Sequence, residues 1–138
     1  MLRAGFASAD EFRRLTYIAA LMRCFPGRNP QGDGDLRPSP AGVANCAHWL
    51  DAELELLQPT AMFLVGQMAI ARFLGSGSLE DRVGRTFGTR PVMVPLPHPS
   101  GQSRWLNEAA NRERLARALA EISELRRRFL QLHARRSR

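Results

Sequence analysis

One succession of segments constrains the fold of this chain more than any other feature. It is an apolar segment, a glycine, a short helix and a second apolar segment. Residues 60–65 form an apolar run, Gly66 allows a tight turn, and residues 67–74 have the pattern of a helix that Gly75 ends. A second apolar run follows over residues 92–96. Strands that alternate with helices pair in parallel, so we predict an α/β fold with a short parallel sheet.

The second apolar run leads directly into a histidine between two prolines. Pro97 and Pro99 end the strand and restrict the backbone on either side of His98. Open α/β sheets bind their ligands at the carboxyl ends of the strands, which is where this imidazole is carried. We therefore predict that His98 is a reactive group. The alternative is that it only packs in the turn.

The first third of the chain is predicted to hold a short helix, a strand and a long loop. Ser8 and Asp10 are suited to cap the helix, and residues 15–22 have the apolar pattern of a strand. Residues 25–42 contain four prolines and four glycines. This composition predicts a long irregular loop, and loops of that length inside a compact domain are usually functional or disordered.

Two helices are predicted in the remainder. Ser39 is a good N-cap with Pro40 at the first helical position, and that helix ends near Gln58. A long basic helix is expected over about residues 107–133, followed by a disordered arginine-rich tail. We expect all these segments to form a single domain over residues 1–138.

The charge of the chain suits a polyanionic partner. The chain has 20 basic and 13 acidic residues, a formal net charge of +7, and every basic residue is arginine. The planar guanidinium binds paired oxyanions such as those of phosphate, although a solvated basic surface explains the charge equally well. Residues 1–14 lack the apolar segment of a secretory signal, and the longest apolar stretch is too short for a membrane helix. We expect a cytoplasmic protein without a membrane partner.

Several ordered motifs resemble the uracil-DNA glycosylase superfamily, in particular its iron–sulfur-containing branch. They are Cys24-Phe25-Pro26-Gly27, Cys46-Ala47-His48-Trp49-Leu50, the segment from Leu56 to Gly66, Leu96-Pro97-His98-Pro99-Ser100, and Arg104-Trp105. The resemblance runs from about residue 17 to residue 120. It implies a three-layer α/β/α domain that flips a uracil out of duplex DNA and hydrolyses its N-glycosidic bond, a step of base excision repair.

The resemblance also implies roles for the residues around the histidine. His98 would be the catalytic group, since a donor at O2 of the departing base stabilises the negative charge that develops there. The residues after Pro97 and His98 would bind DNA, through a phosphate contact and through a wedge in the base stack. They are Pro99, Ser100, Gly101, Gln102, Ser103 and Arg104.

Cys24 and Cys46 match two of the four ligands of the family's 4Fe-4S cluster. Four thiolates hold such a cluster, and this chain has two cysteines. We therefore expect the cluster to be incomplete or absent within one copy of the chain. The alternatives are a zinc site with His48 as a third ligand and a pair of free thiols, of which we favour the thiols.

The family's first strand, with the motif that positions water, has no counterpart in residues 1–10. That strand is central in the family's sheet, and without it two apolar strand edges lack a partner. We expect that the chain is truncated, mis-started or one half of a split protein, and that a partner or missing segment supplies the strand. Ala19-Ala20 stands where many relatives carry an asparagine that reads uracil, which opens the substrate range to other deaminated bases.

Three functions stay open at this point. The first is a glycosylase for uracil or another deaminated base. The second is a nonenzymatic module that binds nucleic acid through arginines of residues 104–138 and 23–37. The third is a degenerate fragment with no role of its own. Substitution of His98 separates the first two, because it should abolish turnover and spare binding.

Overall fold

The chain consists of two compact units in a computed structural model that describes residues 4–32, 34–99 and 104–136. The larger unit comprises Met1–Thr16 and Pro59–Arg138, and it carries both strands. The smaller unit is Tyr17–Gln58 and carries one long helix. The family resemblance found in the sequence draws on both units.

The sheet of the larger unit has two parallel strands, β1 (Ala61–Val65) and β2 (Val92–Leu96), as predicted. They pair residue for residue from their first to their last positions, so their carboxyl ends lie at the same edge. The connection between them contains α3 (Gln67–Leu74), which Gly75 caps, and the single turn α4 (Leu79–Arg82). The order strand, helix, strand confirms an α/β fold with a parallel sheet.

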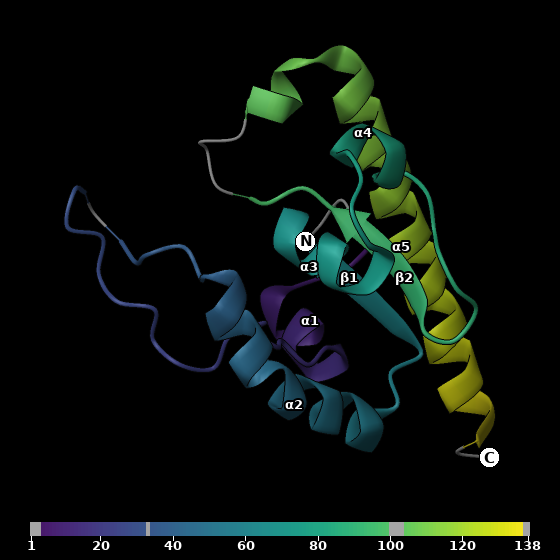
Figure 1. Ribbon diagram of the computed structural model, residues 1–138. Coiled ribbons are helices and arrows are strands. Elements are labelled where there is room, and N and C mark those ends of the chain that lie inside the picture. Colours follow the sequence, from purple (N-terminus) through teal and green to yellow (C-terminus); the bar gives the residue numbers. More distant parts are fainter. Residues whose placement is uncertain (1–3, 33, 100–103, 137–138) are drawn as a thin grey trace. The chain divides into compact units, whose positions relative to one another are not determined.

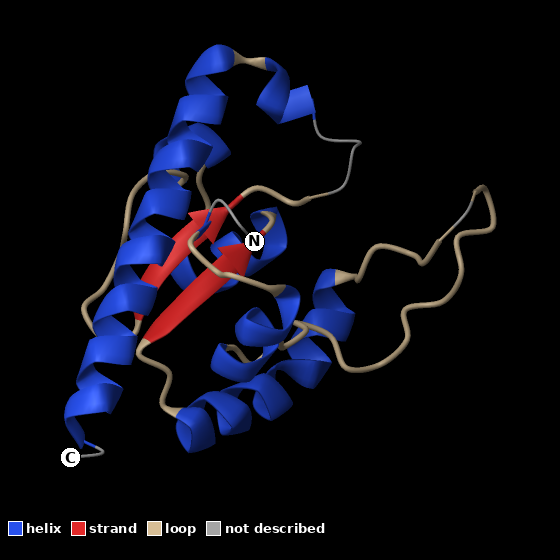
Figure 2. Cartoon of the chain, turned by 180° about the vertical axis from the view of Figure 1, so that it is seen from behind, coloured by secondary structure: helices blue, strands red, loops and turns tan. Residues whose placement is uncertain are grey.

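Helices lie on both faces of this sheet (Figure 1 and Figure 2). On one face, Val94 packs in a buried cluster with Ala118 and Ile122 of α5 (Ala109–Arg136). Side chains along a strand point alternately to the two faces of the sheet. Leu64 of β1 points to the face opposite Val94, and α3 covers that face with its buried residue Ile70. The sheet is therefore the middle layer of an α/β/α arrangement.

The amino-terminal segment of the larger unit belongs to its core. The predicted helix is α1 (Ala9–Leu15), and the Ser8 side chain caps it by accepting a hydrogen bond from the backbone N–H of Glu11. Phe6, only 4% exposed, lies in the cluster with α5. The guanidinium of Arg126 on α5 binds the Glu11 carboxylate and lies over the Phe6 ring. These contacts attach the amino terminus to α5.

The smaller unit contains α2 (Pro40–Leu57), whose predicted ends are confirmed. The Ser39 side chain accepts a hydrogen bond from the backbone N–H of Gly42, and Gln58 adopts the left-handed conformation that ends the helix. The loop before α2 has some local order. Arg28 and Asp35 form an antiparallel bridge, which closes a turn within the predicted irregular segment.

The strand predicted over residues 15–22 is wrong. Leu15 is the last residue of α1, and residues 16–22 form no strand. The Tyr17 hydroxyl and the Arg23 guanidinium both bind Glu53 of α2, so this extended segment follows a helix instead of a sheet edge. An apolar run becomes a strand only where a neighbouring strand takes up its backbone hydrogen bonds.

The expected disordered tail is also wrong for the residues that the structure describes. Helix α5 continues to Arg136 in a chain of 138 residues. Leu132 is 61% exposed, so the buried face of α5 ends before it. Among the helices of the described residues, none combines the length and the hydropathy needed to cross a membrane.

Candidate active site

His98 stands at the edge of the sheet where both strands end. Strand β2 ends at Leu96, Pro97 is buried and His98 is exposed. The backbone N–H of Gly66, the residue after β1, donates to the Leu96 carbonyl at 2.9 Å. The end of one strand is thereby fixed against the end of the other, and the predicted position of the imidazole at the carboxyl edge is confirmed.

Gly66 leaves the space that the imidazole occupies. Its φ of +86° lies in a region that favours glycine. A Cβ atom on Gly66 would lie 3.4 Å from Cβ of His98 and 3.3 Å from Cδ2, and the second distance is shorter than ordinary van der Waals contact. Gly66 is also the N-cap of α3 and offers no side chain to its first N–H groups. The imidazole and the uncapped start of α3 therefore lie at the same end of the two strands.

Side chains fix the loop that follows α3. The Gln67 amide nitrogen donates to the Gly77 carbonyl at 2.6 Å. The Arg82 guanidinium donates to the carbonyls of Leu74 and Ser76 at 2.9 and 3.1 Å. These contacts hold α3 and α4 together beside the strand ends. Neither side chain has a role predicted from the sequence, because the acceptors are carbonyls that only the folded loop brings within reach.

The predicted DNA-binding residues are only partly described. Pro99 and Arg104 are both exposed, and Arg104 begins a 3₁₀ turn over Arg104–Asn107. The other four lie outside the described residues: Ser100, Gly101, Gln102 and Ser103.

A buried asparagine holds the chain in place directly after Arg104. Asn111, 1% exposed, donates from its amide nitrogen to the Trp105 carbonyl at 2.9 Å. The Trp105 indole N–H donates to the Glu80 carboxylate at 2.6 Å. Asn111 is not among the residues predicted from the sequence. The sequence signal for this residue is its spacing, since Asn111 is a polar residue on the same face of α5 as the apolar Leu115 and Ala118.

The two cysteines of the smaller unit lie together, with 3.6 Å between their sulfur atoms. Cys24 is exposed and Cys46 is buried. Hydrogen bonds from the backbone N–H groups of Arg23 and Cys24 lower the pKa of Cys46, whereas the hydrogen bond to Cys46 raises the pKa of Cys24. Cys46 is therefore the sulfur that ionises more readily.

The described residues add no further metal ligand to this cysteine pair. Within the described ranges, no three or more His, Cys, Asp or Glu side chains are grouped so that they could hold a metal ion. The zinc arrangement with His48 as third ligand is therefore not formed there. The imidazole of His48 contacts the neighbouring Trp49 ring instead, with 4.7 Å between the ring centroids.

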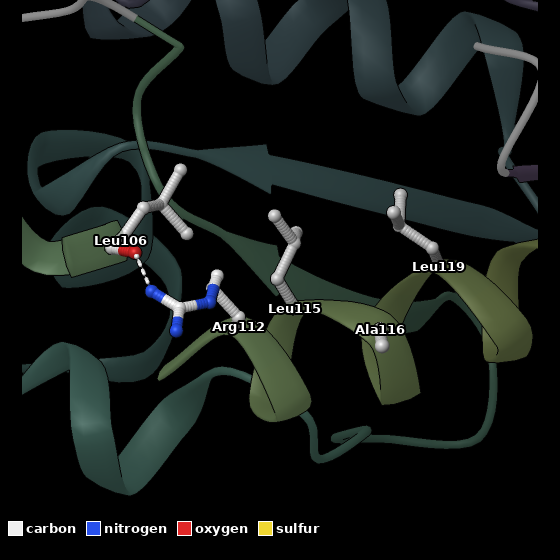
Figure 3. A pocket seen from close by; sticks show the side chains of 5 residues that line it. All are labelled: Leu106, Arg112, Leu115, Ala116 and Leu119. Carbon is white, nitrogen blue, oxygen red and sulfur yellow. Dashed lines mark hydrogen bonds between the residues drawn. The ribbon is translucent and has the colours of Figure 1, made fainter. Parts of the chain in front are cut away.

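A groove of about 280 Å³ lies elsewhere in the larger unit (Figure 3). Its walls come from α5 and the 3₁₀ turn, and the residues that line it are Leu106, Arg112, Leu115, Ala116 and Leu119. The Arg112 guanidinium donates to the Leu106 carbonyl at 3.0 Å, as Figure 3 shows. The groove offers no acid, base or nucleophile, so the candidate active site is the strand edge that carries His98.

Most arginines of α5 are bound within the chain. Arg112 and Arg114 donate to backbone carbonyls, and Arg126 binds Glu11. Arg127 and Arg128 both bind Glu124. The basic helix therefore presents fewer unengaged guanidinium groups than its sequence suggests.

Comparison with known proteins gives two matches. The family model of the uracil DNA glycosylase superfamily matches residues 1–123. A protein of Pyrobaculum aerophilum that is named type-5 uracil-DNA glycosylase is 31% identical over 91 residues, which cover 63% of this chain and 37% of that protein. The chain thus spans well under half the length of this relative. The family match includes both units and the whole edge that carries His98.

Proposed function

Because the chain belongs to the uracil-DNA glycosylase superfamily, we propose that it excises uracil or another deaminated base from DNA by hydrolysis of the N-glycosidic bond. The observation that supports this most directly is the position of His98, which is exposed at the carboxyl end of β2, where Gly66 leaves room for its imidazole. The relative named type-5 uracil-DNA glycosylase supports the same class of reaction.

His98 would act on the departing base. Cleavage of the bond leaves an electron pair on the base, and a ring N–H of the imidazole would donate a hydrogen bond to its O2 atom. The buried Pro97 and the hydrogen bond between Gly66 and Leu96 restrict the backbone that carries the imidazole. A donor held in place before the reaction stabilises developing charge better than one that must reorient.

The segment after His98 would bind the DNA strand. Pro99 is exposed beside the histidine, and Arg104 is exposed where the described chain resumes. Ser100 and Gly101 would contact a phosphate, and Gln102 and Ser103 would join Arg104 in the wedge. The contacts of Asn111 and Trp105 hold the chain directly after Arg104 in place, which supports a role of Arg104 in the wedge.

For the cofactor, the described residues supply two of the four sulfur ligands that a 4Fe-4S cluster needs, Cys24 and Cys46. A cluster in this family would be held by such cysteines and would serve as a structural support. Two thiols without further grouped ligands do not fit a complete site, and no catalytic step here depends on a cluster.

We also propose that both units form one partial glycosylase domain and that a further segment supplies a strand to it. The family match extends over both units, and within the described residues β1 has a strand partner on one edge only. An apolar strand with an unpaired edge costs stability. If the chain alone reaches the roughly 5–15 kcal/mol usual for a complete domain in urea unfolding, this part of the proposal is contradicted.

The function is tested by release of uracil from a duplex oligonucleotide with one uracil, detected as strand cleavage after alkali treatment of the abasic site. The full chain is used in excess over DNA so that a slow reaction is detected. His98→Ala should lower the single-turnover rate about 10²–10³-fold, because one preorganised donor is lost. Binding of the same duplex should change little. His133→Ala is the matched control, since His133 is an exposed histidine near the end of α5.

Two results would contradict the proposal. One is intact DNA after incubation with the wild-type chain. The other is equal cleavage by the wild type and by His98→Ala, which would leave the histidine as a packing residue of the turn.

A further inference from the structure

A closed ring of hydrogen bonds joins α4, the 3₁₀ turn and the first turns of α5. The Trp105 indole N–H donates to the Glu80 carboxylate at 2.6 Å, and the Glu80 backbone carbonyl accepts from Nε of Arg114 at 3.1 Å. The Arg114 guanidinium also donates to Oδ1 of Asn111 at 3.0 Å. Nδ2 of Asn111 donates to the Trp105 carbonyl at 2.9 Å, which closes the ring at its first residue.

This ring lies directly beside Arg104, the exposed residue that precedes Trp105. We propose that Glu80 is a positioning residue of the glycosylase reaction, because its hydrogen bond to Trp105 holds Arg104 where the wedge enters the base stack. The inference rests on the proposed function. Glu80 belongs to α4 and not to the segment that would bind DNA, so it acts through Trp105.

Trp105 is held at its side chain and at its backbone. Its ring is half-buried and packs against the core cluster of the larger unit, while its N–H reaches Glu80. An indole with an apolar body and one polar group is fixed in orientation when both are engaged. The peptide bond between Arg104 and Trp105 is planar and rigid, so a shift of the Trp105 backbone moves Arg104 as well.

Helix α4 is a firm support for Glu80. Leu79 packs against the core cluster, and Val83 is only 2% exposed. Gly84, directly after α4, approaches α5 so closely that a Cβ atom on it would lie 2.9 Å from the Arg114 carbonyl oxygen. The carboxylate of Glu80 therefore projects from a short helix whose neighbours on both sides are fixed to the core.

A wedge held in place by the ring should matter most when a base must leave an intact stack. Unstacking and unpairing a base is unfavourable, and this cost is smallest for a base that is already unpaired. A residue that is ordered before it binds loses less conformational freedom on insertion. Loss of the bond between Glu80 and Trp105 should therefore slow the reaction at a paired uracil and affect an unpaired uracil much less.

The test compares single-turnover uracil release from two duplexes, with the full chain in excess. One duplex pairs the uracil with adenine, and the other places the same uracil inside a bubble of mismatches. Glu80→Ala and Trp105→Phe each remove the hydrogen bond, and each should slow release from the paired site about 3–10-fold. Release from the bubble should stay close to the wild-type rate.

Two further variants separate the hydrogen bond from other effects of substitution. Glu80→Gln keeps a carbonyl oxygen that can accept from the indole, so it should restore most of the rate at the paired site. The double variant Glu80→Ala with Trp105→Phe should be no slower than either single variant, because both remove the same interaction. Glu121→Ala, at an exposed carboxylate of α5, is the matched control and should behave like the wild type.

Three results would overturn the inference while the proposed function stands. They are equal slowing on both duplexes, which indicates a merely structural role, additive slowing in the double variant, and wild-type rates in Glu80→Ala. A wild-type chain that releases uracil from neither duplex would contradict the proposed function, and this inference with it.

Discussion

At the scale of single residues, the relation between Gly66 and His98 determines the candidate site. Gly66→Ala should destabilise the chain by about 1–3 kcal/mol, because its φ of +86° and ψ of 161° suit glycine almost alone. The new methyl group should also push the imidazole, since Cδ2 of His98 lies 3.3 Å from the Cβ position. We expect lower stability in urea and, in addition, slower cleavage of uracil-containing DNA.

Gly75→Ala separates these two effects. Gly75 ends α3 with a φ of +77°, and nothing lies within 4 Å of its Cβ position. This variant should lose a similar amount of stability from backbone strain and keep the imidazole undisturbed. Equal loss of cleavage in both variants would show that the contact between Gly66 and His98 has no role of its own.

At the scale of elements, the attachment of α1 to α5 depends on the ionised form of Glu11. The hydrogen bond from Arg126, with one from the backbone N–H of Ala7, lowers the pKa of Glu11. Its contribution to stability is present above the pKa of an unfolded glutamate and disappears as the pH falls through the lowered pKa of the folded state.

Glu11→Gln should therefore flatten the acid side of the stability profile. Urea unfolding between about pH 7 and about pH 3 should show the wild type losing stability that the variant lacks throughout. Glu113→Gln, at an exposed carboxylate of α5, is the matched control and should keep the wild-type profile. Parallel profiles for the wild type and Glu11→Gln would exclude this role of the ion pair.

At the scale of the whole molecule, the two units should differ in local stability. The larger unit holds most of the buried apolar residues, whereas the smaller has Cys46 and Leu50. Segments with few buried contacts open at lower free energy. Hydrogen exchange followed by mass spectrometry should show amides of residues 40–58 exchanging before those of β1, β2 and α5. Exchange in the reverse order would contradict the expectation that the smaller unit opens at lower free energy than the larger one.

Much of the fold could be predicted because its signals are local. Ser39 with Pro40 begins α2, Gly75 ends α3, and apolar runs mark β1 and β2. Residues 15–22 carry the same kind of apolar run and still form no strand, because Tyr17 is bound to α2 through Glu53. Whether an apolar run becomes a strand depends on its neighbours.

The features of the candidate site also divide into those that the sequence predicts and those that appear only in the folded chain. The sequence by itself determined that His98 follows a strand between two prolines, since proline restricts the backbone wherever the chain goes. Only the tertiary structure decided that Gly66 leaves room for the imidazole, that Asn111 anchors the returning chain, and that two sulfurs lie 3.6 Å apart. Such contacts join residues far apart in the chain, and their distances depend on how all the intervening elements pack.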